Sequence, residues 1–461
     1  MGLTFVKSTC QNAHFNTVFH VKFSQMDGEQ NTEIETHIFE RPTDQSHVLI
    51  IHEKLMKRKT DRYILNIALA YHKLGYKVTI LTSQYDKHDC IGDVKFADSV
   101  SVLYSGWWIP RSFLGLFRSN MSAFKAAWMA FRLICFPPEP KPELVVLDVS
   151  LFALYFLKLF TKYKVFYVET FLELKNTDAC YEHSKNNPTL LEAKWVKLAD
   201  EIIVETIGFC EILKKSYPSL NVKPKVLYPS IDIGLWNEPG IKIHRIIPDL
   251  MDNTVLFLTI GKFKRSSNFK LALDAFELLL EVIDDKTVTK RFQLVIAGNC
   301  KTLEEKFHYN EMMAAAKQRI CASQVTFLKQ LPIVHEKTLI MESTVMIHPA
   351  KNDVHSDFLL KAMSLGKPIV ATNKGIASKI LVHRLSGVII DPEPRMFAIA
   401  MKKLIVSPHL QVFLGDMARD TFDKSYSFES FCSKVNQMMK RPLLKDSAST
   451  LCPSESVKTR N

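Results

Sequence analysis

Short apolar runs alternate with segments of helical periodicity along most of this chain. After a polar leader over residues 1–46, the stretch HVLIIHEKL predicts a buried strand. TDRYILNIALAYHKLG then places apolar side chains at helical spacing up to a stop at Gly75, and KVTILTSQY predicts another strand. Together the three segments predict a βαβ unit with a parallel crossover.

The same alternation continues to about residue 230 and restarts at residue 254. Further apolar runs of the first series are VSVLYS, ELVVLDV, KVFYVET, EIIVET and KVLYPS. After a polar connector over 231–253 come TVLFLTIG, FQLVIAG, VTFLKQL, VMIHPA, PIVATN and GVIID. We therefore predict an α/β protein with two Rossmann-like domains, 47–230 and 254–440, a flexible tail at 441–461, and a ligand cleft between the domains.

Composition and charge narrow the class of ligand. The 461 residues exceed one compact core, and 47% hydrophobic with 23% charged residues is typical of a folded globular protein. A net charge of +12 favours an anionic partner, such as a phosphorylated molecule or an acidic membrane face. The charge is spread along the chain without a nucleic-acid-binding motif, so no nucleic-acid partner is expected. Nine cysteines without a CxxC pair predict no metal site and a reducing, cytosol-facing compartment.

Several motifs carry a family resemblance over roughly residues 47–440. In the second half GKFKRSSN, the acidic loop KNDVHSDF and SGVIIDP occur in an order that resembles the retaining, nucleotide-sugar-dependent glycosyltransferases of the GT-B fold, family 4. In the first half WWIPR, FYVETFLEL, KLADEIIVET and KVLYPSID are similar to the mannosyltransferases that add α-1,3 and α-1,6 mannoses to the dolichol-linked oligosaccharide. The resemblance implies GDP-mannose as donor, a lipid-linked glycan as acceptor, no metal cofactor, and the cytosolic face of the endoplasmic reticulum membrane.

The resemblance also implies roles for individual residues. Asp353 matches a catalytic acid that holds donor-sugar hydroxyls, and Lys361 stands where the family has a second acid that accepts hydrogen bonds from ribose. Lys262 and Arg265 are the candidates for neutralising the leaving diphosphate, with Ser267 in place of the family's lysine.

Five further positions complete the predicted cleft. On the donor side His355 replaces an aromatic residue, Ser356 replaces a glycine, and Gly375 remains from a glycine-rich turn over the phosphates. On the acceptor side the resemblance points to Arg62 and to Glu169, which stands where a histidine faces the reacting sugar.

Two functional hypotheses stay open at this point. An ammonium group has donors and no lone pair, so Lys361 cannot accept from ribose hydroxyls. Together with Ser267 and Ser356, this charge reversal is compatible with a non-catalytic paralogue that binds an active glycosyltransferase or a glycan. The other hypothesis is an active mannosyltransferase whose donor site has been rebuilt.

Residues 107–136 mix tryptophans and phenylalanines with basic residues, among them Lys125 and Arg132. This pattern is typical of a segment at a membrane interface. The longest apolar run, LVVLDVSLFALYFLKLF, is interrupted by Asp148 and is shorter than the ~20 residues of a spanning helix, so we predict a strand followed by a helix there.

Overall fold

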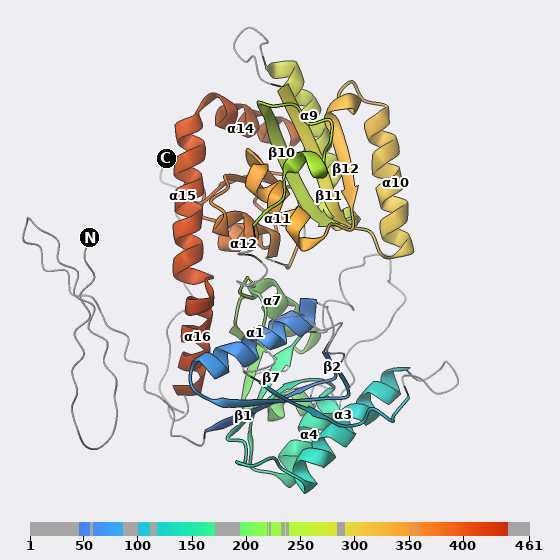
Figure 1. The fold of residues 1–461 in the computed structure, drawn as a ribbon, viewed down its shortest axis with the longest axis vertical. Coiled ribbons are helices and arrows are strands. Elements are labelled where there is room, and N and C mark those ends of the chain that lie inside the picture. Colours follow the sequence, from blue (N-terminus) through green and yellow to red (C-terminus); the bar gives the residue numbers. More distant parts are fainter. Residues whose placement is uncertain are drawn as a thin grey trace, which may run out of the picture. The chain divides into compact units, whose positions relative to one another are not determined.

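The fold is that of a computed structural model (Figure 1), which describes residues 46–55, 59–85, 100–110, 118–170, 194–218, 220, 223–231, 236, 239–283, 291–351, 353–355 and 357–440. The predicted leader up to residue 45 and the predicted tail at 441–461 lie outside the described residues.

A seven-stranded parallel sheet forms the core of the first half. Its spatial order is β5 (Ser101–Tyr104), β3 (Lys77–Thr82), β1 (His47–His52), β6 (Leu144–Asp148), β7 (Lys164–Glu169), β8 (Glu201–Val204) and β9 (Lys225–Val226). Every pairing in it is parallel, and β2 (Lys54–Leu55) and β4 (Gln84–Tyr85) form a separate parallel pair. The chain thus runs outward from β1 in one direction and then returns to continue from β6 in the other, as in a doubly wound fold.

Helices cover both faces of this sheet. They are α1 (Lys59–Lys73), α3 (Arg118–Cys135), α4 (Leu151–Phe160), α7 (Ile207–Ser216) and the short 3-10 helix η1 (Val196–Leu198). Because side chains alternate along a strand, Val48 and Ile50 of β1 enter the core beneath α1, while Leu49 and Ile51 enter the core beneath α3 and α4. The predicted strand and helix around Asp148 are confirmed as β6 and α4.

A six-stranded parallel sheet forms the second half with the same winding. Its order is β12 (Val325–Lys329), β11 (Arg291–Asn299), β10 (Thr254–Lys262), β13 (Val345–His348), β14 (Ile369–Thr372) and β15 (Val388–Ile390). The α-helices are α9 (Phe269–Val282), α10 (Leu303–Lys317), α11 (Ile333–Glu342), α12 (Asp357–Ser364), α13 (Ala377–Ile380), α14 (Pro394–Val406) and α15 (Pro408–Ser425). Short 3-10 turns are η2 (Ile243–Arg245), η3 (Arg265–Ser267) and η4 (Ala322–Gln324). The predicted α/β fold with two Rossmann-like halves is confirmed.

The last helix, α16 (Phe428–Lys440), packs in the core of the first half. Phe431 and Val435 are buried there, and the Phe431 ring lies edge-to-face with Tyr63 of α1 at a centroid distance of 6.4 Å. The sequence pattern predicts a single domain over residues 254–440, which would include α16. Helical periodicity shows that one face of a helix is buried, but it does not show which sheet covers that face.

No single helix among the described residues is long and apolar enough to cross a bilayer. The pair Pro394–Val406 and Pro408–Met439 reaches that length and apolarity together, but it bends by 103° at its break. Within this pair Phe397, Met401 and Leu404 are buried in the core of the second half.

Candidate functional site

A cavity of about 320 Å³ lies where the central strands of the second sheet end. The carboxyl ends of β10 and β13, which flank the reversal of strand order, supply Gly261 and His348. The first half supplies Arg62, Tyr63, Asn66 and Glu205. Ligands of open parallel sheets bind at such a reversal point, because loops on either side of it diverge and leave a crevice. The cavity is therefore the candidate active site.

Asp353 lines this cavity on the loop between β13 and α12. Its Oδ1 accepts a hydrogen bond from the backbone N–H of His355 at 2.9 Å, and its own carbonyl accepts from Ile376 at 2.9 Å. Its Oδ2 lies 3.8 Å from Nε2 of His348, a strand-end residue that the sequence analysis did not select. Burial lowers the pKa of His348, an effect that the Asp353 carboxylate opposes only in part. At neutral pH the acid therefore faces an uncharged imidazole.

The Asp353 loop is anchored to the first half of the chain. The Thr206 hydroxyl caps the N-terminus of α7 and also donates to the Val354 carbonyl at 2.7 Å. A β-carbon on Gly208 would lie 3.0 Å from Cγ1 of Val354, so a glycine allows this close approach. His355 packs against Phe209 with ring centroids 5.7 Å apart. The loop is thus positioned by both halves of the chain.

Lys361 also lines the cavity, and it is paired with an acid. Its Nζ lies 2.7 Å from Oε1 of Glu336 on α11, and it sits 5.5 Å from the ring centroids of both Trp236 and Phe358. The side chains of Lys361 and Glu336 are only 20% and 12% exposed. The charge reversal predicted at position 361 is therefore accompanied by a carboxylate supplied from a neighbouring helix.

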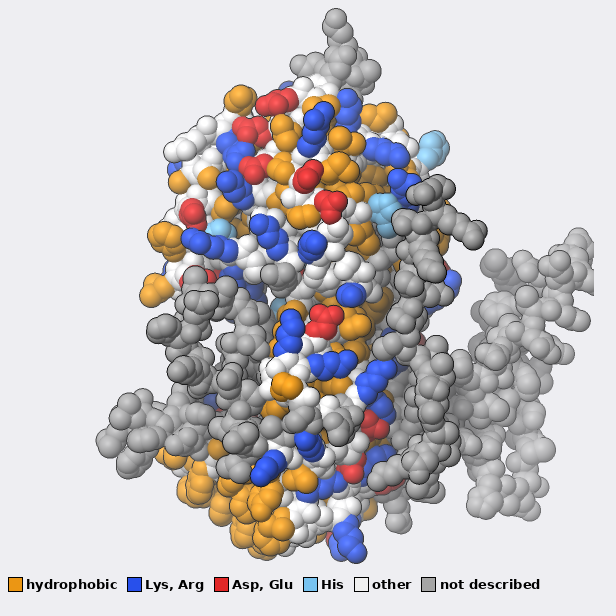
Figure 2. Space-filling model, turned by 180° about the vertical axis from the view of Figure 1, so that it is seen from behind, with side chains coloured by type: hydrophobic (Ala, Val, Ile, Leu, Met, Phe, Trp, Pro, Cys, Tyr) orange, Lys and Arg blue, Asp and Glu red, His pale blue; other side chains and the backbone are white. Residues whose placement is uncertain are grey.

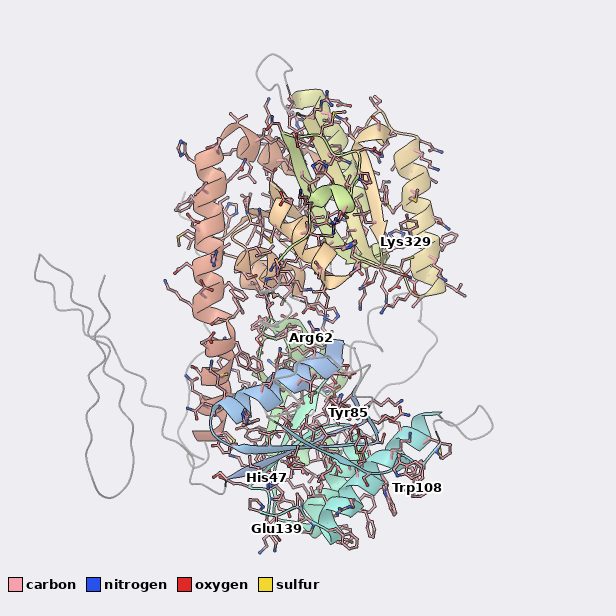
Figure 3. All side chains as sticks on the ribbon, in the orientation of Figure 1. His47, Arg62, Tyr85, Trp108, Glu139 and Lys329 are labelled. Carbon is pink, nitrogen blue, oxygen red and sulfur yellow. The ribbon has the colours of Figure 1, made fainter. Side chains whose placement is uncertain are left out.

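Besides Lys361, the cations of the candidate site are Lys262, Lys264 and Arg62. Lys262 at the end of β10 and Lys264 just beyond it line the cavity, and Arg62 enters from the first turn of α1, where Figure 3 shows its position. The Ser267 hydroxyl donates to the Lys262 carbonyl at 2.6 Å, which closes the turn between β10 and α9. Arg265 is exposed and is not part of the described cavity lining.

Two other predicted residues lie away from the cavity lining, and one cannot be placed. Gly375 has a φ of +62° and lies against the backbone of Asp353. Glu169 is buried at the end of β7, where it accepts a hydrogen bond from the Tyr167 hydroxyl at 3.1 Å. Ser356 lies outside the described residues. The roles implied for Gly375 and Glu169 stay predictions.

A buried ionic network lies at the carboxyl ends of the first sheet. His52 bonds Asp148 through Nδ1 at 2.7 Å and Asp61 through Nε2 at 3.0 Å. Burial alone lowers the pKa of His52, but hydrogen bonds to Asp148 and Asp61 and their charges outweigh it and raise the pKa to about 9. The network ties the first turn of α1, which carries Arg62, to the sheet.

Comparisons with known proteins agree with this architecture. Residues 241–421 match the family model described as "Glycosyl transferases group 1". This part of the chain is a glycosyltransferase group 1 domain.

Sequence relatives extend the likeness beyond the group 1 domain. The chain is similar to the "Alpha-1,3/1,6-mannosyltransferase ALG2" of Dictyostelium discoideum, with 26% identity over 86% of this chain and 98% of that protein. It is also similar to the human protein of the same name, with 25% identity over 86% and 96%.

A solved structure extends the likeness of the fold. The sucrose-phosphate synthase of Thermosynechococcus elongatus superposes with a TM-score of 0.64 at 13% identity, covering 86% of this chain and 98% of that one. The two Rossmann-like halves therefore form a GT-B fold.

Several residues that line the cavity were not among the residues predicted from the sequence. Glu336, Trp236 and His348 line the cavity, and so do Tyr63, Asn66 and Glu205 from the first half. For His348 a signal was available, because VMIHPA places a histidine at the end of a buried strand. Glu336 and Trp236 lie in a helix and a connector without a motif, so only the fold identifies them.

A second surface feature lies over α3 and α4. Figure 2 shows hydrophobic side chains gathered there, and the exposed ones include Trp107, Trp108, Phe131, Phe136, Leu159 and Phe160. We call these six residues, the aromatic ones together with Leu159, the aromatic surface. Figure 3 marks Trp108 beside α3, where its ring meets Trp128 at 5.2 Å. Lys125, which the sequence analysis counted among the interfacial cations, is buried, whereas Arg132 lies over the Phe136 ring.

Proposed function

We propose that this protein is a mannosyltransferase that transfers mannose from GDP-mannose to a lipid-linked oligosaccharide with retention of anomeric configuration. The observation that carries the proposal is the cavity at the strand ends of a group 1 domain, in which an acid and several cations converge. The relatives match over 86% of this chain, and their names support mannose as the transferred sugar and a glycan as the acceptor.

The proposed roles of the cavity residues follow from the charges of their side chains. Lys262 and Lys264 stabilise the diphosphate as negative charge develops on the leaving group, since cations placed at that point lower the barrier most. Asp353 accepts hydrogen bonds from hydroxyls of the mannose, and its fixed loop orients the sugar. Arg62 lines the cavity from the first half, and we assign it to the acceptor side.

The Lys361–Glu336 pair favours an active enzyme over a non-catalytic paralogue. A lysine in place of an acid would leave the site without an acceptor, but the Glu336 carboxylate lies 2.7 Å from Lys361 inside the same cavity. The cavity therefore keeps both an acid at position 353 and an acid beside position 361.

The aromatic surface supports action at a membrane, which we propose is the endoplasmic reticulum membrane at its cytosolic face. A cluster of exposed aromatic rings is unusual on the surface of a monomer, and it suits the interfacial region of a bilayer. Arg132 and the exposed Lys162 after α4 lie next to them and fit acidic headgroups. A lipid-linked acceptor would be presented at such a surface.

Transfer of radiolabelled mannose from GDP-mannose to lipid-linked oligosaccharide tests the proposal. The diagnostic variant is Asp353→Asn, because the amide oxygen can still accept from His355 while the negative charge is lost. We expect Asp353→Asn to lower the rate at least a hundredfold, about 3 kcal/mol of transition-state stabilisation. Asp416→Asn on the exposed side of α15 is the matched control.

Three outcomes separate the hypotheses. Labelled product with an α-linked mannose supports the proposal. GDP binding without transfer to any lipid-linked acceptor would instead support the non-catalytic paralogue. Full activity of Asp353→Asn would remove this residue from the mechanism while leaving the proposed reaction in place.

A further inference from the structure

The strongest unexplained feature of the cavity is the carboxylate of Glu336. It lies in the first turn of α11, whose backbone begins with a hydrogen bond from Glu336 N–H to the Pro332 carbonyl at 3.0 Å. The side chain is nearly buried and forms part of the cavity wall. Because the carboxylate lines the cavity, its remaining acceptor positions are available to a bound ligand.

The Glu336 carboxylate uses only part of its capacity to accept hydrogen bonds. Oε1 accepts from Lys361 at 2.7 Å, and no described residue donates a hydrogen bond to Oε2. A carboxylate offers about four lone-pair positions, so it can accept further hydrogen bonds while it keeps the lysine. The ligand that satisfies it must carry hydroxyl or N–H donors.

Three separate elements hold the carboxylate in place. The Lys361 ammonium lies 5.5 Å from the ring centroids of both Trp236 and Phe358, and these contacts restrict where it can donate. The Trp236 indole N–H donates to the Ser364 hydroxyl at 3.2 Å, and that hydroxyl donates to the Lys361 carbonyl at 2.8 Å. The connector, α11 and α12 therefore fix one geometry, which is what specific recognition of a small polar group requires.

The cavity wall defines the shape of the ligand. Lys262 and Lys264, on the loop between β10 and α9, favour a diphosphate. Glu336 and Trp236 lie on other elements of the same wall and favour a group with hydroxyl donors beside an apolar face. A nucleoside diphosphate carries both features, because its ribose presents two adjacent hydroxyls and is joined to the phosphates through a single methylene.

We infer that Glu336 accepts hydrogen bonds from the ribose hydroxyls of the donor nucleotide, with Lys361 as the positioning residue that holds its carboxylate. The inference rests on the proposed function for the nature of the ligand and goes beyond it in assigning ribose recognition to α11. In this arrangement Lys361 does not contact the phosphates. It holds Glu336, which makes the contact with ribose.

Calorimetric titration with GDP and with 2′-deoxy-GDP isolates the ribose. The wild-type protein is expected to bind GDP about tenfold or more tightly than 2′-deoxy-GDP, since a hydrogen bond to a charged group is lost with the hydroxyl. Glu336→Gln is expected to weaken GDP binding by about tenfold and to reduce the ratio between the two ligands toward one, because the acceptor loses its charge. Glu342→Gln, an exposed acid at the end of the same helix, should keep the wild-type ratio.

A charge-swapped variant guards against a purely structural effect. Lys361→Glu alone places two acids side by side and should weaken GDP binding. Combining it with Glu336→Lys restores the ion pair and returns a carboxylate to the cavity, so GDP discrimination should recover in the double variant.

The outcomes distinguish this inference from the proposed function. A folded Glu336→Gln variant that keeps the wild-type ratio of GDP to 2′-deoxy-GDP would overturn the role of Glu336 and leave the transferase proposal intact. Failure of the double variant to recover discrimination would also overturn it. No binding of GDP or UDP by the wild-type protein would overturn both.

Discussion

Gly375 packs directly against the backbone of Asp353. A β-carbon at Gly375 would lie 2.9 Å from the Asp353 carbonyl oxygen and 3.0 Å from the Asp353 nitrogen, and the next residue, Ile376, donates to that carbonyl. The glycine that the sequence analysis assigned to the phosphates therefore shapes the loop that carries the acid. Under the proposed mechanism, Gly375 contributes to catalysis through the position of Asp353.

Gly375→Ala should destabilise the protein and displace the Asp353 loop. The φ of +62° strains any residue with a side chain by about 1 kcal/mol, and the overlap with backbone atoms adds to this. Gly366→Ala is a matched control, since its φ is +63° but its β-carbon would meet nothing closer than 3.5 Å. Thermal melts should show instability in both variants, larger in Gly375→Ala, and mannose transfer should be lost in Gly375→Ala alone. Equal activity of the two would contradict a role for this contact.

Thr206 offers a test of the link between the two halves. Thr206→Val removes the hydroxyl that caps α7 and donates to Val354, leaving a carbonyl without its hydrogen bond. We expect a loss of about 2 kcal/mol in the free energy of unfolding and weaker donor binding. Thr206→Ser keeps the hydroxyl and should behave like the wild type in urea denaturation. Indistinguishable stability of the valine and serine variants would argue against the link.

The His52 network predicts a pH dependence of stability. The pKa of His52 in the folded protein is about 9, above the usual value of 6.5, so folding favours the protonated imidazole. The resulting stabilisation is fully present below pH 6.5 and is lost as the pH rises through 9, by roughly 3 kcal/mol in total. Urea denaturation at pH 6.5 and pH 9.5 measures this loss.

Asp148→Asn supplies the comparison for that measurement. The asparagine oxygen can still accept from His52, and its amide can donate to the Thr170 hydroxyl, which bonds Asp148 in the native protein. Loss of the charge lowers the pKa of His52, so the fall in stability between the two pH values should shrink. His72→Gln on the exposed side of α1 should leave the fall unchanged. An unaltered pH dependence in Asp148→Asn would show that other groups cause it.

The aromatic surface predicts binding to acidic phospholipid vesicles. Replacing Trp107, Phe131 and Phe160 with serine should lower the fraction of protein that co-sediments with vesicles by at least tenfold. Each ring that moves from water into the membrane interface contributes on the order of 1–2 kcal/mol to binding. The control replaces Phe307, Ile320 and Phe413, which are exposed on other elements. Equal vesicle binding of the two triple variants would exclude the aromatic surface as the contact.

Much of the fold follows from local patterns in this sequence. The order of strands and helices and the stop at Gly75 were predictable, because alternation and helical spacing report which side chains are buried. The predicted site residues Lys262, Asp353, His355, Lys361 and Arg62 do line one cavity. Strand ends of parallel sheets meet at one edge, so motifs at those ends converge.

The sequence by itself determined two parallel α/β halves and the chemical types gathered at their strand ends. The tertiary structure decided which residues meet: Glu336 with Lys361, Gly375 with Asp353, and α16 with α1. It also decided that Leu159 and Phe160 of an apolar helix face outward, whereas Lys125 is buried. Periodicity records that a side chain is buried or exposed, but its partner depends on strand order and helix packing across the whole chain, which no local pattern contains.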